Sequence, residues 1–375
     1  MIIKRNLNLL VLTVISCLIL FSSCKKEKQP IPEVSSVKIS EVDKNMFTYI
    51  KKAGDVYDKN EIWNGYDFSK QPYFLVFRDK DEKPTKGYIL NPHKNLEGIG
   101  KIASNQKIGL NIVAYNKQLE EANKDLKSEN GVYSFEFKIQ GGKYAVFSYS
   151  EKEFNNLNEG VRPLLIHELF HVFQNKWQLV EGAVQDEKNY PITKELLPLQ
   201  LLFYKMSKSI MKEKDPSRLK EYLKMYVSIR SKEMQLDPSA AKLVKNFANN
   251  QESGEGTARY VEVAALNELY PGNKNIGIAP EFKDLEKTFP TAKDFRGFAA
   301  WGIWYNTGEA VVHMLKTIGG VDVEKQHMKG KNLYQLAEGL VQLSNSDKAI
   351  YLAKAKSEFN WQAIVSIADK LLALK

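Results

Sequence analysis

The chain has 375 residues, of which 43% are hydrophobic, so it can bury a substantial core and its composition excludes a disordered protein. Its formal charge of +9 comes from 54 basic and 45 acidic residues. Because the basic residues are scattered among acidic ones and form no block, the charge favours a solvated surface over nucleic-acid binding.

The N-terminus has the pattern of an export signal. Two basic residues precede a largely apolar run from Asn6 to Phe21, which is shorter than the roughly 20 residues that a membrane-spanning helix prefers. Small residues directly before Cys24 resemble the lipobox of bacterial lipoproteins. We expect residues 1–23 to be a lipoprotein signal peptide and Cys24 to carry a lipid. An ordinary cleaved signal and an uncleaved anchor are the alternatives.

The cysteine count agrees with lipidation. Cys17 would be removed with the signal peptide, Cys24 would be modified, and the sequence has no other cysteine. The mature chain would then form no internal disulfide. These features predict a protein that is lipid-anchored to a membrane of the bacterial cell envelope, at the outer membrane or the cell surface.

The mature chain begins with a tether and a helix. Residues 24–37 are rich in Lys, Pro and Ser and have no apolar period, which is typical of a tether. Residues 41–59 carry an apolar stripe at helical spacing. The stripe consists of Met46, Tyr49, Ile50, Ala53 and Tyr57.

Strand patterns dominate the region that follows. Four apolar or alternating runs predict two β-hairpins, the first around a charged connection and the second around Gly141 and Gly142. The runs are residues 72–77, 87–90, 133–139 and 143–149. We therefore expect residues 38–155 to form a β-rich N-terminal lobe.

Beyond residue 155 the apolar spacing becomes helical, and Asp215 and Pro216 predict the start of one helix. In another predicted helix His167 and His171 are four residues apart, so both imidazoles leave the same face about one turn from each other. Two ligands of one tetrahedral zinc require this spacing. Glu168, beside the first histidine, can reach a water without binding the metal. The alternative is a pair of histidines hydrogen-bonded within a core helix.

A catalytic zinc site needs a third protein ligand and an open position. The three other histidines do not extend the pattern as a metzincin histidine would. Residues 255–262 read Glu-Gly-Thr-Ala-Arg-Tyr-Val-Glu, and this segment resembles the gluzincins of the aminopeptidase N and leukotriene hydrolase type, in which Glu-Gly-x-Ala-x-Tyr supplies the third ligand. The resemblance implies that Glu255 is this ligand. The small side chains of Gly256 and Ala258 predict a close approach to the histidine helix.

A second stretch strengthens the resemblance. Residues 305–315 are similar to the family segment whose leading tyrosine binds the oxyanion, which implies that role for Tyr305. Aromatic packing at a helix start is the alternative. Tyr260 is a second candidate for the oxyanion, unless its hydroxyl is structural. Glu262 lies near the same helix face as the predicted glutamate ligand, where it would either orient a ligand histidine or face solvent.

The resemblance covers roughly residues 147–320 and implies an α+β, zincin-like fold. We expect zinc-binding helices in residues 156–284 and a helical C-terminal region in residues 285–375. About eighty residues separate the second histidine from the glutamate ligand, far more than is usual in aminopeptidase N. Residues 177–248 are therefore predicted to be a helical insertion between the two ligand helices.

One family element is absent. The Gly-x-Met-Glu-Asn strand, which recognises a substrate amino terminus, is replaced by residues 141–147. We expect this strand to lie along the cleft and to pair with an extended peptide through its backbone. The choice between endopeptidase and exopeptidase stays open.

The motifs predict a metallohydrolase with one Zn²⁺ per chain, held by His167, His171 and Glu255. Glu168 is the predicted general base, Tyr305 shares the oxyanion with zinc, and a peptide or protein is the expected substrate. A hydrolase of a non-peptide substrate is one alternative. Another is a binding lipoprotein that keeps a zincin scaffold without turnover. Loss of Glu168 or of a ligand would indicate the latter, and all are present.

Overall fold

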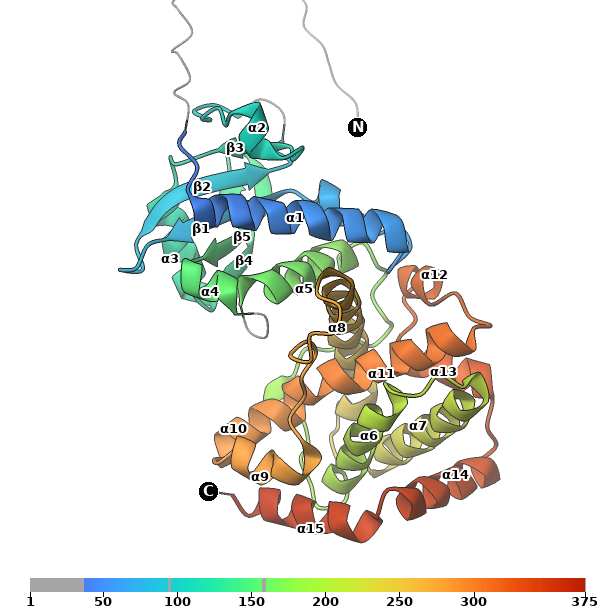
Figure 1. Cartoon of the computed structure of the whole chain (residues 1–375). Helices are drawn as coiled ribbons and strands as arrows, with labels where there is room; N and C mark the ends of the chain where they lie inside the picture. The colour runs from blue at the N-terminus through green and yellow to red at the C-terminus, as the bar shows by residue number, and fades with distance from the viewer. Residues whose placement is uncertain (1–36, 94–95, 157–159, 375) are drawn as a thin grey trace, which may run out of the picture. The chain divides into compact units, whose positions relative to one another are not determined.

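The computed structural model describes residues 37–93, 96–156 and 160–374 (Figure 1). The predicted signal peptide, Cys24 and the tether up to residue 36 lie outside the described residues. In the described part, a five-stranded sheet occupies the N-terminal region and most of the remainder is helical, which confirms the α+β class. None of the helices in that part is both long and apolar enough to cross a membrane.

The sheet consists of β1 (Tyr73–Arg78), β2 (Pro84–Leu90), β3 (Ile112–Ala114), β4 (Tyr133–Ile139) and β5 (Gly142–Tyr149). Their order is β3-β2-β1-β5-β4. β1 pairs antiparallel with β2, and β4 pairs antiparallel with β5, which confirms the two predicted hairpins. The sequence did not predict β3 or the parallel pairing of β1 with β5 that joins the hairpins.

The strand order corrects one expectation. We expected the strand at residues 141–147 to offer its backbone to a peptide. However, β5 is hydrogen-bonded to β1 on one side and to β4 on the other, so it has no free edge. Among the described residues β4 pairs only with β5. The edge strands of the sheet are β3 and β4, so an extended peptide that adds a strand would pair with one of these two and not with β5.

Fifteen α-helices, three 3-10 segments (η1, η2 and η4) and two π-helical segments (η3 and η5) lie in the described residues. The N-terminal region contains α1 (Glu41–Asn60), η1 (Phe68–Lys70), α2 (Ser104–Lys107), α3 (Leu119–Glu129) and α4 (Glu151–Asn155). The following residues contain α5 (Val161–Gln174), η2 (Glu187–Asn189), α6 (Leu197–Ile210), α7 (Pro216–Leu236), η3 (Val244–Ala248) and α8 (Asn249–Leu269). The last part contains η4 (Phe282–Asp284), α9 (Leu285–Thr288), α10 (Ala292–Gly297), η5 (Phe298–Gly302), α11 (Ile303–Ile318), α12 (Val323–Met328), α13 (Leu333–Val341), α14 (Asn345–Glu358) and α15 (Trp361–Leu372).

Helix α1 follows from its local sequence. The Ser40 hydroxyl accepts a hydrogen bond from the Asp43 backbone, and the Asp43 carboxylate accepts one from the Ser40 backbone. All five residues of the predicted apolar stripe are buried. The helix predicted at residues 41–59 is thus confirmed.

Asp43 also joins α1 to the sheet. Its buried carboxylate accepts hydrogen bonds from the hydroxyls of Tyr88 at 2.9 Å and Tyr149 at 2.7 Å, and it pairs with Lys86 at 2.9 Å. Burial opposes ionisation of Asp43, but its hydrogen bonds with Ser40, Lys86 and Tyr149 outweigh this effect and lower its pKa. Charge-assisted hydrogen bonds therefore hold β2 and β5 against α1.

Apolar layers cover both faces of the sheet, as the two-residue period of a strand allows. On one face Phe74 and Val146 pack in a cluster with Leu126 of α3. On the other face Leu75 and Phe147 belong to the larger core that also contains the buried residues of α1 and α5. Helix α5 is thus held against a rigid sheet.

The helical part of the chain is built around α8 and α11, which lie side by side. Helix α5 crosses α8, and α6 and α7 pack against α11. Both α6 and α7 lie within residues 177–248, where a helical insertion was predicted. Asp215 caps α7 as expected, because its side chain accepts a hydrogen bond from the Ser217 backbone at 3.0 Å.

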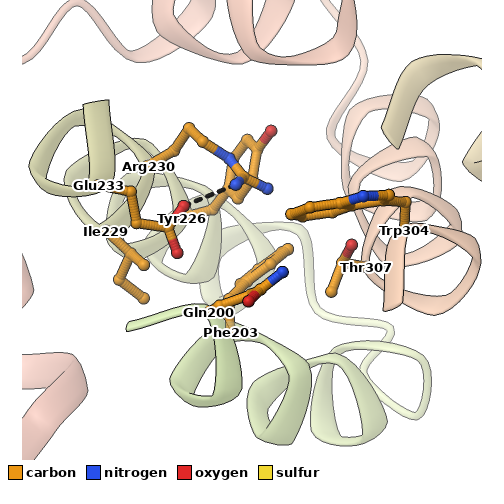
Figure 2. Close-up of a pocket in the computed structure, with 8 residues that line it drawn as sticks. All are labelled: Gln200, Phe203, Tyr226, Ile229, Arg230, Glu233, Trp304 and Thr307. Atoms are coloured by element: carbon orange, nitrogen blue, oxygen red, sulfur yellow. Dashed lines mark hydrogen bonds and ion pairs between the residues drawn. The ribbon is translucent and has the colours of Figure 1, made fainter. Parts of the chain in front are cut away.

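A buried ionic cluster connects α7 to α8. Arg230 donates to Glu233 at 2.6 Å and to Glu252 at 2.8 Å, and Tyr226 donates to Glu252 at 2.5 Å. In Figure 2 the Arg230 guanidinium faces the Trp304 ring, whose centroid lies 5.0 Å away. Burial raises the pKa of Glu233 to about 7, although Arg230 acts in the opposite direction. One guanidinium therefore compensates two buried carboxyl groups.

Replacing Arg230 with Met should lower the free energy of unfolding by roughly 3–5 kcal/mol, because two buried carboxyl groups lose their counter-ion. Burial raises the pKa of Glu233 to about 7, so the wild type loses stability as the pH rises from the ordinary glutamate value to about 7, and loses no more above it. Without Arg230, which lowers this pKa, the pKa should rise further and the variant should go on losing stability above pH 7. The loss should therefore be larger at pH 8 than at pH 6. Urea unfolding followed by circular dichroism measures both values.

Arg218→Met on the same helix is the matched control. Arg218 pairs with Glu221 and Glu358 at partly exposed positions, so its removal should cost less than about 1 kcal/mol. Equal losses in the two variants would show that the buried cluster has no special part in stability.

Candidate metal centre

Helix α5 carries the two predicted histidine ligands. Pro163 stands in its first turn, where a missing N–H is tolerated, and Leu165, Ile166 and Leu169 are buried in the core. Because that face is fixed by packing, His167 and His171 leave α5 together on another side. His167 is buried, and the side chain of His171 is 21% exposed.

Helix α8 brings Glu255 to the same point. Gly256, next to it, allows α11 to approach closely, since a Cβ at Gly256 would lie 2.3 Å from the Gly308 Cα atom. This corrects the expectation that Gly256 admits the histidine helix, because the glycine faces α11 instead of α5. The same contact brings α11, and with it Tyr305, to His167 and Glu255.

Three ligand atoms converge. The Nε2 atoms of His167 and His171 are 3.1 Å apart, and they lie 3.2 Å and 3.3 Å from the Glu255 Oε2 atom. Zinc bonds of roughly 2.0–2.1 Å in a tetrahedron place neighbouring ligand atoms about 3.3 Å apart. The donor set of two imidazoles and one carboxylate therefore fits one zinc ion with a fourth position open. The ligand atoms of His167, His171 and Glu255 all lie within 4.8 Å of one another, so these three residues could hold a metal ion.

A side-chain acceptor at the Nδ1 atom orients each of the two histidine rings. The Nδ1 atom of His167 lies 3.1 Å from the Glu262 carboxylate, whose other oxygen accepts from Arg259 at 2.6 Å. The Nδ1 atom of His171 lies 2.6 Å from the Gln174 side-chain oxygen. Since both partners are acceptors, each Nδ1 carries a proton, and each Nε2 is the atom that would bind a metal after losing its own proton. Glu262 thus occupies the expected place, whereas the sequence did not point to Gln174.

The electrostatics favour a positive charge at this point. Burial alone would lower the pKa of His167, but contacts with Glu255 and Glu262 raise it to about 10. Burial likewise opposes ionisation of Glu255, yet His171 and His167 bring its pKa below the ordinary value. A divalent cation can supply the charge that these carboxylates stabilise, and its binding would displace protons from the imidazoles.

Glu168 lies beside the ligand group and is buried. Burial raises its pKa, although His167 and His171 oppose the effect. The hydroxyl of Tyr133, the first residue of β4, lies beside Glu168. Both burial and the charge of Glu168 raise the pKa of this hydroxyl. Tyr133 was not among the predicted residues, because only the folded sheet brings β4 to α5.

Tyr305, on α11, contacts two of the three candidate ligands. Its ring stacks on His167 at 5.3 Å with an interplanar angle of 14°, and its hydroxyl lies beside Glu255. Burial and the Glu255 charge raise the pKa of this phenol. The other candidate, Tyr260, has different surroundings: Lys316 lies over its ring, 5.6 Å from the centroid. The structure therefore brings Tyr305, and not Tyr260, to the ligand atoms.

No protein-family model, curated protein or solved structure matches this chain. The geometry of the site is thus the available guide to its chemistry. It assembles two potential metal ligands from one helix, a third from a second helix, a buried carboxylate and a phenol.

Gly256→Ala should move α11 away from α8 and lower the free energy of unfolding by about 1–3 kcal/mol, because the new methyl group would overlap the Gly308 backbone. Gly254→Ala, on the same helix, is the control. No atom lies within 4 Å of its added Cβ, so it should be neutral or stabilising by up to about 1 kcal/mol. Thermal unfolding of both variants tests this, and equal behaviour would contradict the close contact.

Proposed function

We propose that the protein is a zinc-dependent metallohydrolase of the gluzincin type, most consistent with a peptidase. The supporting observation is the spacing of three ligand atoms at 3.1–3.3 Å, which matches tetrahedral zinc. His167, His171 and Glu255 would hold one zinc ion per chain. When bound, zinc would act as a Lewis acid and lower the pKa of a water molecule.

The chain's own residues supply the proton transfers. Glu168 lies beside the ligands, and as a carboxylate it would take the proton of the attacking water and return it to the leaving amine. Its raised pKa suits a group that must both accept and release a proton near neutral pH. Tyr305, which stacks on His167, would donate its hydroxyl proton to the developing oxyanion.

An extended peptide suits the surroundings of the site. The edge strand β4 begins at Tyr133, and the hydroxyl of this residue lies beside Glu168, so the first side chain of the strand contacts the general base. Main-chain hydrogen bonds along such an edge would align a peptide without regard to its sequence. The protein would then act on peptide or protein substrates, with no part for nucleic acid.

Zinc content tests the ligand assignment. His167→Ala and Glu255→Gln should reduce the zinc bound to purified protein from one per chain, because each removes one of three ligands. Glu268→Gln, at an exposed position of the same helix as Glu255, should keep full occupancy. Elemental analysis of the dialysed proteins gives the answer, and full occupancy in Glu255→Gln would disprove the ligand set.

Peptide cleavage separates an enzyme from a binding protein. Glu168→Gln should keep zinc and lose about 10²–10⁴-fold in kcat, the usual contribution of general-base catalysis. Tyr305→Phe should keep zinc and lose about 10²–10³-fold, as expected for one oxyanion donor. Tyr115→Phe is the control, since the Tyr115 hydroxyl bonds to Gln118 at the far side of the sheet. If the zinc-loaded wild type binds peptides but cleaves none in a broad library, the binding-lipoprotein alternative is correct.

We further propose attachment to the cell envelope through a lipid on Cys24, which the lipobox-like sequence supports. Cys24→Ser should move the protein from the membrane fraction to the soluble fraction. Immunoblotting of fractionated cells measures the shift, with Cys17→Ser as the control. Unchanged partition of Cys24→Ser would mean that another element holds the protein.

A further inference from the structure

The indole of Trp301 contacts the predicted oxyanion donor. Its Nε1 atom lies 3.3 Å from the Tyr305 hydroxyl oxygen. Trp301 belongs to η5, a π-helical segment that leads directly into α11, and Tyr305 stands in the first turn of α11. Such π-helical turns occur frequently at functional sites.

The direction of this hydrogen bond is fixed by chemistry. An indole N–H can only donate, so the phenol oxygen of Tyr305 must be the acceptor. One lone pair of that oxygen is then occupied, and the phenol's own hydrogen has to point elsewhere. Glu255 lies beside the hydroxyl, and the stacked His167 ring closes another side. The free hydrogen is thus directed towards the ligand atoms.

The neighbouring tryptophan shows that this arrangement is specific. Trp304, three residues later, donates its Nε1–H to the Ala300 carbonyl at 2.8 Å and lies fully buried in the core. It has the same indole group in the same helical stretch, but its N–H donates to a backbone carbonyl oxygen and not to a side chain. Of these two tryptophans, Trp301 is the one whose N–H donates to a side chain at the candidate site.

We propose that Trp301 is a positioning residue, which holds the Tyr305 phenol so that its proton faces the oxyanion. This inference rests on the proposed hydrolytic function. Donation from the indole also polarises the phenol, since hydrogen bonds in a chain strengthen one another.

A double-mutant cycle tests the proposal. Trp301→Phe should lower kcat about threefold to tenfold, the effect of one net hydrogen bond, and leave KM and zinc content unchanged. In the Tyr305→Phe background the same change should cause no further loss, because the group that Trp301 positions is gone. Trp304→Phe, the matched control, should alter stability but not kcat per zinc-loaded molecule. A similar kcat loss in Trp304→Phe, or an undiminished Trp301 effect without the Tyr305 hydroxyl, would overturn the inference.

A second measurement does not depend on turnover. A phosphinic peptide with alanine side chains carries a charged oxygen that imitates the oxyanion, and its affinity can be measured by calorimetry. Trp301→Phe should weaken this affinity about threefold to tenfold, and only when Tyr305 is present. If the zinc-loaded wild type cleaves no peptide, the proposed hydrolysis fails while this affinity still decides the role of Trp301. Equal affinity of wild type and Trp301→Phe would refute that role.

Discussion

Two helices have to meet at one point for this site to exist, and much of the structure fixes their crossing. Helix α1 reaches both of them: the Tyr49 hydroxyl donates to the Arg162 carbonyl of α5, and the Tyr57 hydroxyl donates to the Val261 carbonyl of α8. From α5, Gln174 donates to the Gly254 carbonyl and to Thr257 on α8. The distances between the ligand atoms therefore depend on contacts made well outside the ligand group.

The position of α11 relative to α5 and α8 depends on close backbone packing. Helix α11 packs along α8, where the glycine pair Gly256 and Gly308 lets the two backbones touch. The Arg230 cluster then connects α8 to α7, which lies in the region predicted to be an insertion. Helix α7 thus helps to fix the position of α8 without contributing a residue to the candidate metal site.

The sequence predicted those parts of the site that depend on local spacing. His167, Glu168 and His171 follow from the helical period, and the Glu255 segment was identified by its motif. Tyr133, Gln174 and Trp301 were missed, because their roles arise from contacts between elements. The same limit applies to the sheet: both hairpins are local and were predicted, but the parallel pairing of β1 with β5 joins strands about seventy residues apart. That pairing made β5 an interior strand and left β4 at the edge.

The balance of charge explains why the two histidines have different partners. A bound dication would be balanced by Glu255 together with an ionised Glu168, and Glu262 is already balanced by Arg259 at 2.6 Å. Glu309 faces Arg259 as well, but burial raises its pKa to about 8, so it is mostly uncharged at neutral pH and does not compete. A carboxylate behind His171 would leave one uncompensated charge in a largely buried site, which is costly. The neutral amide of Gln174 orients that ring without adding the charge.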